Sequence, residues 1–133
     1  ISYVYQFFNL ISFLTVKENM CLTSQIKGKK VDEKELDQVL KLLGLEHKKD
    51  CFANELSGGQ QQRVAIARAI LAHTDIILAD EPTGNLDGEN AKNVMDNLKA
   101  LNKEGKTIVL VTHDLKVANY ADRIIRLEQG KIV

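Results

Sequence analysis

A chain of 133 residues can bury one core and is too short for two ordinary domains, so we expect one domain or part of one. Eighteen Lys and Arg balance eighteen Asp and Glu, which leaves no net charge to favour nucleic acid or anionic lipid. The longest apolar runs, residues 76–79 and 108–111, are far below the roughly 18 residues of a transmembrane helix. The composition therefore predicts a soluble protein.

The cysteines and the first residues suggest no chemistry. Cys21 and Cys51 form no CxxC pair and have no nearby His at metal-ligand spacing, so we expect small, partly buried apolar residues in a reducing cytoplasm. The chain opens on Ile1 without Met, a basic segment or a cleavage site. We interpret this start as a truncation.

The first third of the chain predicts a strand, a loop and a short helix. Residues 1–5 are β-branched and aromatic, typical of the end of a strand, and residues 6–14 form the loop that follows. Thr15 and Glu18 have capping-box spacing, which predicts a helix that residues 27–30 interrupt.

Two longer helices follow, each preceded by a capping signal. Asp32 and Glu35 precede apolar residues spaced i, i+3, i+4, i+7, which predicts an amphipathic helix that ends at Gly44. Ser57 and Gln60 form another capping box, and the apolar residues of the segment 58–72 lie nearly all round the helix axis. We expect this second helix to be largely buried.

The last third predicts a parallel strand–helix–strand unit and a hairpin. Residues 76–79 form an apolar run before Pro82, typical of a central strand covered on both faces. A helix over about 89–102 leads to a second buried strand over 107–111, which should point the same way. The segment 123–133, with Gln-Gly near its middle, predicts a terminal hairpin.

Three side chains that can act on a phosphate follow the predicted strands. Asp80, Glu81 and His113 come just after strand ends, and ligands of open parallel sheets bind beyond that edge. Phosphoryl transfer requires a carboxylate that positions magnesium, a group that activates water and a donor to the γ-phosphate. The alternative interpretation is a polar strand end beside a proline turn.

The glycines at the start of the third helix favour an anion. Gly58 and Gly59 weaken the helix, but they expose backbone N–H groups where the helix dipole attracts negative charge. The alternative is a Ser57 cap with glycines that merely loosen a loop.

Five motifs together identify a family resemblance. Leu-Ser-Gly-Gly-Gln-Gln-Gln-Arg, residues 56–63, resembles the signature of the ABC ATPases, and residues 76–81 resemble their Walker B strand. Gln6 is similar to the glutamine of the Q-loop, residues 85–87 to the D-loop and residues 112–114 to the switch-histidine loop. The motifs occur in the family's order and span nearly the whole chain.

The resemblance implies an α/β fold, a partial P-loop NTPase fold of the ABC ATPase type. Residues 1–133 would be a partial ABC ATPase domain with a parallel sheet core, an α-helical signature subdomain and a C-terminal β-hairpin. Its parts would be the Q-loop at 5–14, the helical subdomain at about 15–72, and the core with Walker B, D-loop and H-loop at about 73–133.

The resemblance also implies roles in ATP hydrolysis with Mg²⁺. Asp80 would hold the magnesium ion through water, and Gln6 would contact the ion and the attacking water. Glu81 would be the general base, and His113 would touch the γ-phosphate.

A second ABC ATPase domain would complete each site, because domains of this family pair head to tail. Ser57, Gly58, Gly59 and Gln60 would contact nucleotide held by the partner domain. Asp87 would lie at the dimer seam, and it is equally suited to cap the following helix.

The sequence departs from the family in one respect. No G-x-x-x-x-G-K-[ST] loop and no upstream adenine-stacking aromatic are present, so the main cradle for the β- and γ-phosphates is missing. We expect this chain alone to bind ATP poorly and to be inactive, with an unpaired sheet edge and an uncovered apolar face that hinder folding.

Three segments, residues 81–87, 8–10 and 14–16, are similar in sequence to the lipoprotein-release, macrolide-export and antimicrobial-peptide-export group of this family. In that family, transmembrane permease subunits dock on the Q-loop and the helical subdomain at the cytoplasmic face of the membrane. Phe7, Phe8 and Phe13 are candidates for this contact, or are simple core residues.

Two other classes of function are alternatives to an ATPase. A non-catalytic module could lend a signature face to a partner ATPase, but it would need no Glu81, His113 or Gln6 of its own. A DNA-associated or translation-associated ABC protein is disfavoured, because the net charge is zero and the segment between Gln6 and Leu56 is short and lacks heptads. We expect no nucleic-acid partner, and we expect His47 and His73 to be surface residues.

Overall fold

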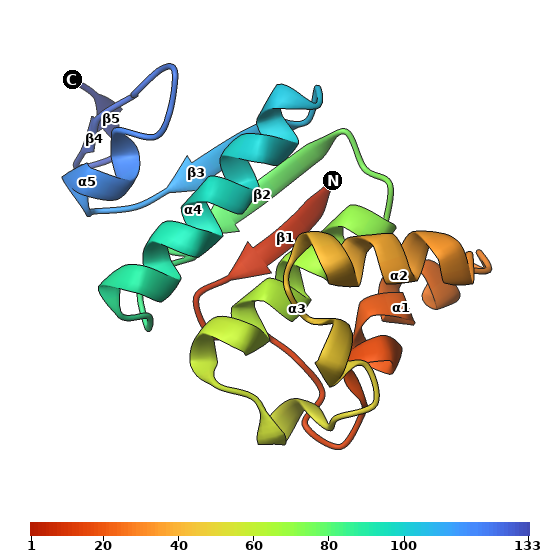
Figure 1. Ribbon diagram of the computed structural model, residues 1–133. Helices are drawn as coiled ribbons and strands as arrows, with labels where there is room; N and C mark the ends of the chain where they lie inside the picture. Colours follow the sequence, from red (N-terminus) through yellow and green to blue (C-terminus); the bar gives the residue numbers. More distant parts are fainter.

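The computed structural model describes all residues, 1–133, as helices packed beside a small parallel sheet (Figure 1). In chain order the elements are β1 (Ser2–Tyr5), α1 (Val16–Ile26), α2 (Glu33–Leu42), the 3-10 helices η1 (Glu46–Lys48) and η2 (Ala53–Glu55), α3 (Gly58–Leu71), β2 (Ile76–Asp80), α4 (Gly88–Lys103), β3 (Thr107–Val111), α5 (Leu115–Ala118), β4 (Leu127–Glu128) and β5 (Lys131–Ile132).

The sheet has three parallel strands in the order β1-β2-β3. Tyr5 and Val111 lie opposite Asp80, the last residue of β2, so the three strands end at one edge. This confirms the predicted α/β class and the common direction of β2 and β3. The loops that follow the strands are thereby brought to the same edge of the sheet.

One face of this sheet is covered and the other is open. Val4 of β1 and Ile77 and Ala79 of β2 point into the core beneath α3 and α4. The residues that alternate with them along these strands face the other way. Two expectations are wrong: β2 is not covered on both faces, since Ile76 and Leu78 are only half-buried, and β3 is not a buried strand, since Val111 remains 57% exposed. The cause is that α3 and α4 pack on a single face, which leaves the predicted uncovered apolar surface.

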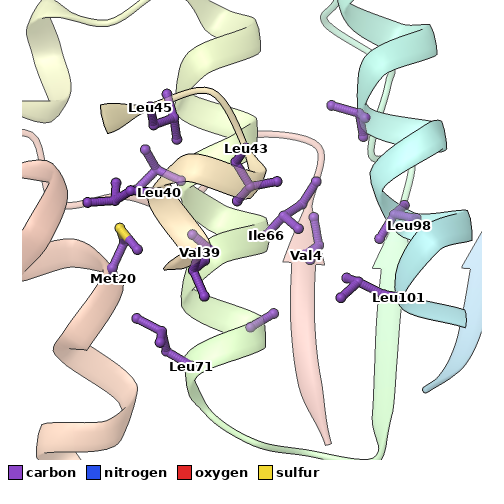
Figure 2. Packing of buried hydrophobic residues seen from close by; sticks show 14 of the residues in the cluster. Val4, Met20, Val39, Leu40, Leu43, Leu45, Ile66, Leu71, Leu98 and Leu101 are labelled. Carbon is purple, nitrogen blue, oxygen red and sulfur yellow. The ribbon is translucent and has the colours of Figure 1, made fainter. Parts of the chain in front are cut away.

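Helix α3 joins the helical part of the molecule to the sheet. It packs against α1 and α2 on one side and against β1 on the other. Buried side chains of these elements form one continuous cluster, in which Figure 2 shows Ile66 and Leu71 of α3 with Met20, Leu40 and Val4. The prediction that α3 is largely buried is therefore confirmed.

The predicted helix caps are largely present. Ser57 and Gln60 make both hydrogen bonds of a capping box, and the Thr15 side chain accepts a hydrogen bond from Glu18 N. Asp32 caps α2 through Lys34 N and not through the predicted Glu35. Each cap satisfies backbone donors that the first turn leaves free, which explains why these helices begin where they do.

The chain after β3 differs most from expectation. The predicted hairpin exists, but its strands are only Leu127–Glu128 and Lys131–Ile132, and Val133 N also donates to Arg126 O at 3.1 Å. Helix α5 was not predicted; it has four residues, too few for a periodic pattern, and begins where Asp114 caps Lys116 N. These short elements depend on local caps and turns.

The remaining minor predictions are confirmed. Cys21 is buried, Cys51 is half-buried, and both are free thiols. His47 and His73 are exposed, and His73 Nε2 lies 2.6 Å from Glu35 Oε1 of α2. None of the helices has the length and apolar character that crossing a membrane requires.

Candidate active site

The ends of β2 and β3 bring Glu81 and His113 into direct contact. Glu81 Oε1 accepts a hydrogen bond from His113 N at 2.8 Å and lies 2.7 Å from His113 Nδ1. Glu81 Oε2 accepts a hydrogen bond from Thr112 Oγ1 at 3.0 Å. The loop after β3 therefore holds both carboxylate oxygens of the residue that follows β2.

These contacts fix the charge and the backbone of Glu81. Partial burial raises the pKa of its carboxyl, but the hydrogen bonds from His113 and Thr112 together outweigh burial and lower the pKa below its ordinary value. Glu81 is thus ionised at neutral pH. Its backbone is in the left-handed region, with φ of 43°, and its N–H donates to Val111 O at 2.9 Å.

Asp80 and Gln6 lie at the same edge of the sheet as Glu81. Asp80 ends β2 with an exposed side chain, and Gln6 directly follows Tyr5, the residue paired with Asp80. The Gln6 side chain lies against Gly84, where an added Cβ would be 2.6 Å from Nε2, and Asn85 Nδ2 donates to Gln6 O at 3.2 Å. The loop after β1 is therefore packed on the loop after β2.

This oxygen donor set fits a magnesium ion, although no three His, Cys, Asp or Glu side chains are grouped as a metal cage. Mg²⁺ commonly takes only one or two protein ligands and completes its shell with water and substrate phosphates. The amide oxygen of Gln6 is a ligand of the required hard type, and the carboxylate of Asp80 would hold the ion through a water molecule, as predicted.

The start of α3 lies beside the loop before α4. An added Cβ on Gly58 would be 3.5 Å from Phe8 and 3.7 Å from Leu86, whereas on Gly59 it would collide with Asn90. No hydrogen bond joins this helix start to Glu81 or His113. The capping interpretation of Ser57 is confirmed, and the predicted contact with nucleotide stays a prediction.

Asp87 caps α4, which is one of the two roles predicted for it. Its Oδ1 accepts from Asn90 N at 2.8 Å, and its Oδ2 accepts from Asn90 Nδ2 at 3.2 Å. A position at a dimer seam is compatible with this cap, because the side chain is exposed. That second role is untested.

Comparison with known proteins settles the family. A family model described as ABC transporter matches residues 1–84, which include Glu81 and the segments predicted to be the Q-loop, the signature and the Walker B strand. This chain belongs to the ABC transporter family. The predicted resemblance is thereby confirmed.

Two relatives place the chain among ABC transporter ATP-binding proteins. It is 48% identical to the macrolide export ATP-binding/permease protein MacB of Campylobacter jejuni, over 100% of this chain and 21% of that protein. It is 44% identical to an uncharacterised ABC transporter ATP-binding protein of Methanocaldococcus jannaschii, over 98% of this chain and 59% of that protein. The chain thus spans only part of the relatives it matches.

Solved structures confirm the ABC ATPase fold. The dimeric structure of a bacterial ABC transporter cassette aligns with a TM-score of 0.85 and 46% identity, over 99% of this chain and 60% of that one. A dimeric post-hydrolysis state bound to ADP and Pi aligns with a TM-score of 0.84 and 44% identity, over 98% and 60%.

Three buried or half-buried polar side chains of this ABC domain had no predicted role. Asn19 of α1 accepts a hydrogen bond from Ile11 N at 2.8 Å and donates to Ile11 O at 3.0 Å. Gln62 and Arg68 of α3 donate to other backbone carbonyls of the same region. Arg68 could have been noticed as a charge inside an apolar helix, whereas nothing in the sequence distinguishes Gln62 from its neighbours.

The Q-loop exposes two of its three phenylalanines. Phe7 is 77% exposed and Phe13 is 75% exposed, so simple core packing does not explain them. Phe8 is half-buried, with its ring against Gly58 at the start of the signature helix. Phe7 and Phe13 therefore meet the requirement for an interface role, and Phe8 is better explained by packing.

We expect Gly59→Ala to destabilise the domain, because its methyl group would collide with Asn90 of α4. The loss should be about 1–3 kcal/mol, as for other overpacked sites, and visible as a lower midpoint of thermal unfolding. Gly58→Ala is the matched control, since its methyl group would meet only ordinary contacts. Equal midpoints for the two variants would show that Gly59 has no packing role.

Proposed function

We propose that this chain is the catalytic part of an ABC transporter ATP-binding subunit, which hydrolyses ATP to drive transport across a membrane. The observation that carries the proposal is the Glu81 carboxylate, ionised and held by Thr112 and His113 at the edge where Asp80 and Gln6 also lie. A module that only lends a surface to a partner ATPase has no need of this arrangement.

Each residue has a role in the proposed mechanism. Glu81 orients the attacking water and takes up its proton, since its carboxylate is already charged. His113, whose side chain is 90% exposed, donates toward the γ-phosphate, while its backbone N–H still holds Glu81. Asp80 and Gln6 would hold magnesium, which supplies charge neutralisation of the phosphates when bound.

The second half of the site is proposed to come from another ABC ATPase domain. Ser57, Gly58, Gly59 and Gln60 present the N-terminus of α3, a 14-residue helix whose dipole favours an anion. No hydrogen bond ties this end to Glu81 or His113 of the same chain, which supports action on a neighbouring domain's nucleotide. The similar solved structures are dimeric, which supports pairing with a second domain.

Steady-state hydrolysis of magnesium ATP tests the proposed activity. The assay uses the native polypeptide that carries this sequence, compared with its Glu81→Gln variant. Hydrolysis that depends on Glu81 supports the proposal. Absence of hydrolysis by the native polypeptide, or hydrolysis indifferent to Glu81, would overturn it.

We further propose that the exposed phenylalanines of the Q-loop contact permease subunits at the cytoplasmic face of the membrane. Large exposed aromatic side chains are typical anchors of protein interfaces. The MacB relatives are named as ATP-binding/permease proteins, which supports a permease partner of the same general kind. The domain would then be peripheral to the membrane and attached through that partner.

Replacing Phe7 and Phe13 together by Ser should uncouple the ATPase from its permease. Since both rings are exposed, we expect the fold and basal hydrolysis to persist while stimulation by the permease falls by about tenfold or more, as for the loss of interface anchors. Ile132→Ser, at a residue of equal exposure in the hairpin, is the control. Undiminished stimulation of the double variant would refute the docking site.

A further inference from the structure

Gln62 contacts the chain next to both predicted catalytic loops. It lies one turn into α3, is 0% exposed, and its Nε2 donates to Tyr5 O at 3.1 Å and to Pro82 O. Tyr5 immediately precedes Gln6, and Pro82 immediately follows Glu81. One side chain of the signature helix therefore joins the two loops that carry the proposed magnesium ligand and the proposed base.

Arg68 holds the next part of the Q-loop from the same helix. Its Nη1 donates to Asn9 O at 2.9 Å and its Nη2 to Phe8 O at 3.3 Å. Phe8 and Asn9 both have left-handed backbones, with φ of 58° and 56°, a conformation that costs residues other than glycine free energy. The two donors of one guanidinium thus stabilise an unfavourable turn of the loop.

Neither side chain is placed there by packing alone. Gln62 Oε1 is buried without a hydrogen-bond partner, and leaving such an acceptor unpaired reduces stability. Burial also lowers the pKa of the Arg68 guanidinium, which reflects the cost of removing that charge from water. An apolar side chain of similar volume would avoid these costs, but it would leave the loop carbonyls without these donors.

We propose that Gln62 and Arg68 are positioning residues that fix Gln6 and Glu81 relative to the signature helix. The proposal rests on the proposed ATPase function. When α3 closes on a neighbouring domain's nucleotide, these hydrogen bonds carry its displacement to the two catalytic loops of its own chain. The catalytic loops of each chain would then be aligned by that chain's own α3, whose N-terminus contacts the nucleotide in the opposite site.

The test is ATP hydrolysis by the native polypeptide carrying Gln62→Met. Methionine keeps the volume and removes both hydrogen bonds, so the catalytic loops lose alignment while the nucleotide contacts remain. We expect kcat to fall about 10- to 100-fold, as for small misplacements of reacting groups. The Kd for ATP should change by less than about threefold, because alignment affects the transition state and not ground-state binding.

Asn102→Leu is the matched control. Asn102 Nδ2 also donates to a backbone carbonyl, that of Lys106 at 3.0 Å, but it lies at the far end of α4. Gln62→Met loses two amide-to-carbonyl hydrogen bonds and Asn102→Leu loses one, so their melting temperatures are measured first and kcat is compared at a temperature where both are folded. A purely structural role of Gln62 would leave kcat equal in the two folded variants. A kcat lowered only in Gln62→Met supports positioning.

Arg68→Lys provides the second variant and decides the question if Gln62→Met does not fold. Lysine keeps the positive charge but cannot reproduce the two-donor fork that reaches both carbonyls. We expect the same fall in kcat with the Kd for ATP retained, and an unchanged kcat would overturn the proposal.

Glu81→Gln in the same assay distinguishes a failure of the positioning proposal from a failure of the proposed ATPase function. If Glu81→Gln is inactive while the Gln62 and Arg68 variants hydrolyse ATP normally, only the positioning proposal fails. If Glu81→Gln retains normal turnover, the proposed function itself fails.

Discussion

Replacing Glu81 by Gln is expected to reduce ATP turnover by about 10²- to 10⁴-fold, the range lost when a general base is removed. Glutamine has nearly the same shape and keeps an oxygen that can accept from Thr112 Oγ1 or His113 N, so the local structure should persist. It carries no charge to attract the proton of the attacking water. ATP binding and dimer closure should therefore be retained while hydrolysis stops.

Two measurements check this result on the native polypeptide. Steady-state phosphate release gives the turnover, and size-exclusion chromatography with ATP shows whether the closed dimer accumulates. Glu128→Gln is the control, because Glu128 is exposed in β4, far along the chain from the sheet edge. Normal turnover of Glu81→Gln would exclude Glu81 as the base.

Replacing Ser57 by Arg is expected to block hydrolysis without weakening nucleotide binding by the isolated monomer. Ser57 is exposed at the start of α3, so an arginine there would occupy the space into which a partner's phosphate is proposed to dock. Turnover should fall by about 10²-fold or more, since the donors at this helix end would no longer reach the developing charge. Loss of binding by the monomer would contradict action on a partner's nucleotide.

The control must separate this steric effect from the loss of a helix cap. Removing an N-cap costs about 1 kcal/mol of stability. Thr15→Arg removes the cap of α1, whose Oγ1 accepts from Glu18 N at 3.2 Å, and introduces the same charge. If Thr15→Arg lowered turnover as much as Ser57→Arg does, the effect would be one of stability and not of docking.

Mixing the two inactive variants gives the sharpest test of the head-to-tail arrangement. In a mixed dimer, the chain with Ser57→Arg supplies Glu81 and the chain with Glu81→Gln supplies an intact signature, so one complete site forms if the signature acts across the interface. Single-turnover hydrolysis with protein in excess should then reappear on mixing. If each site used its own signature, no mixture of the two variants would hydrolyse ATP.

The sequence by itself determined the local structure and the family. The Ser57 and Gln60 capping box and the Thr15 cap act through neighbours a few residues away, so they could be interpreted without the fold. The apolar run 76–79 was also sufficient to predict a strand, although its partners are distant in sequence. The ordered motifs were also sufficient to identify an ABC ATPase. The role of Glu81 as general base was predicted from the resemblance to this family, although not the contacts that hold it.

Only the tertiary structure decided which distant groups meet and which faces are covered. Thr112 reaches Glu81 because β2 and β3 lie in register, and Gln62 reaches Tyr5 O across 57 residues of sequence. The strand β3 has the apolar composition of a buried strand, yet one face is open because α3 and α4 cover only the other. Periodicity reports the preferences of a segment, whereas contacts and burial depend on the elements packed against it.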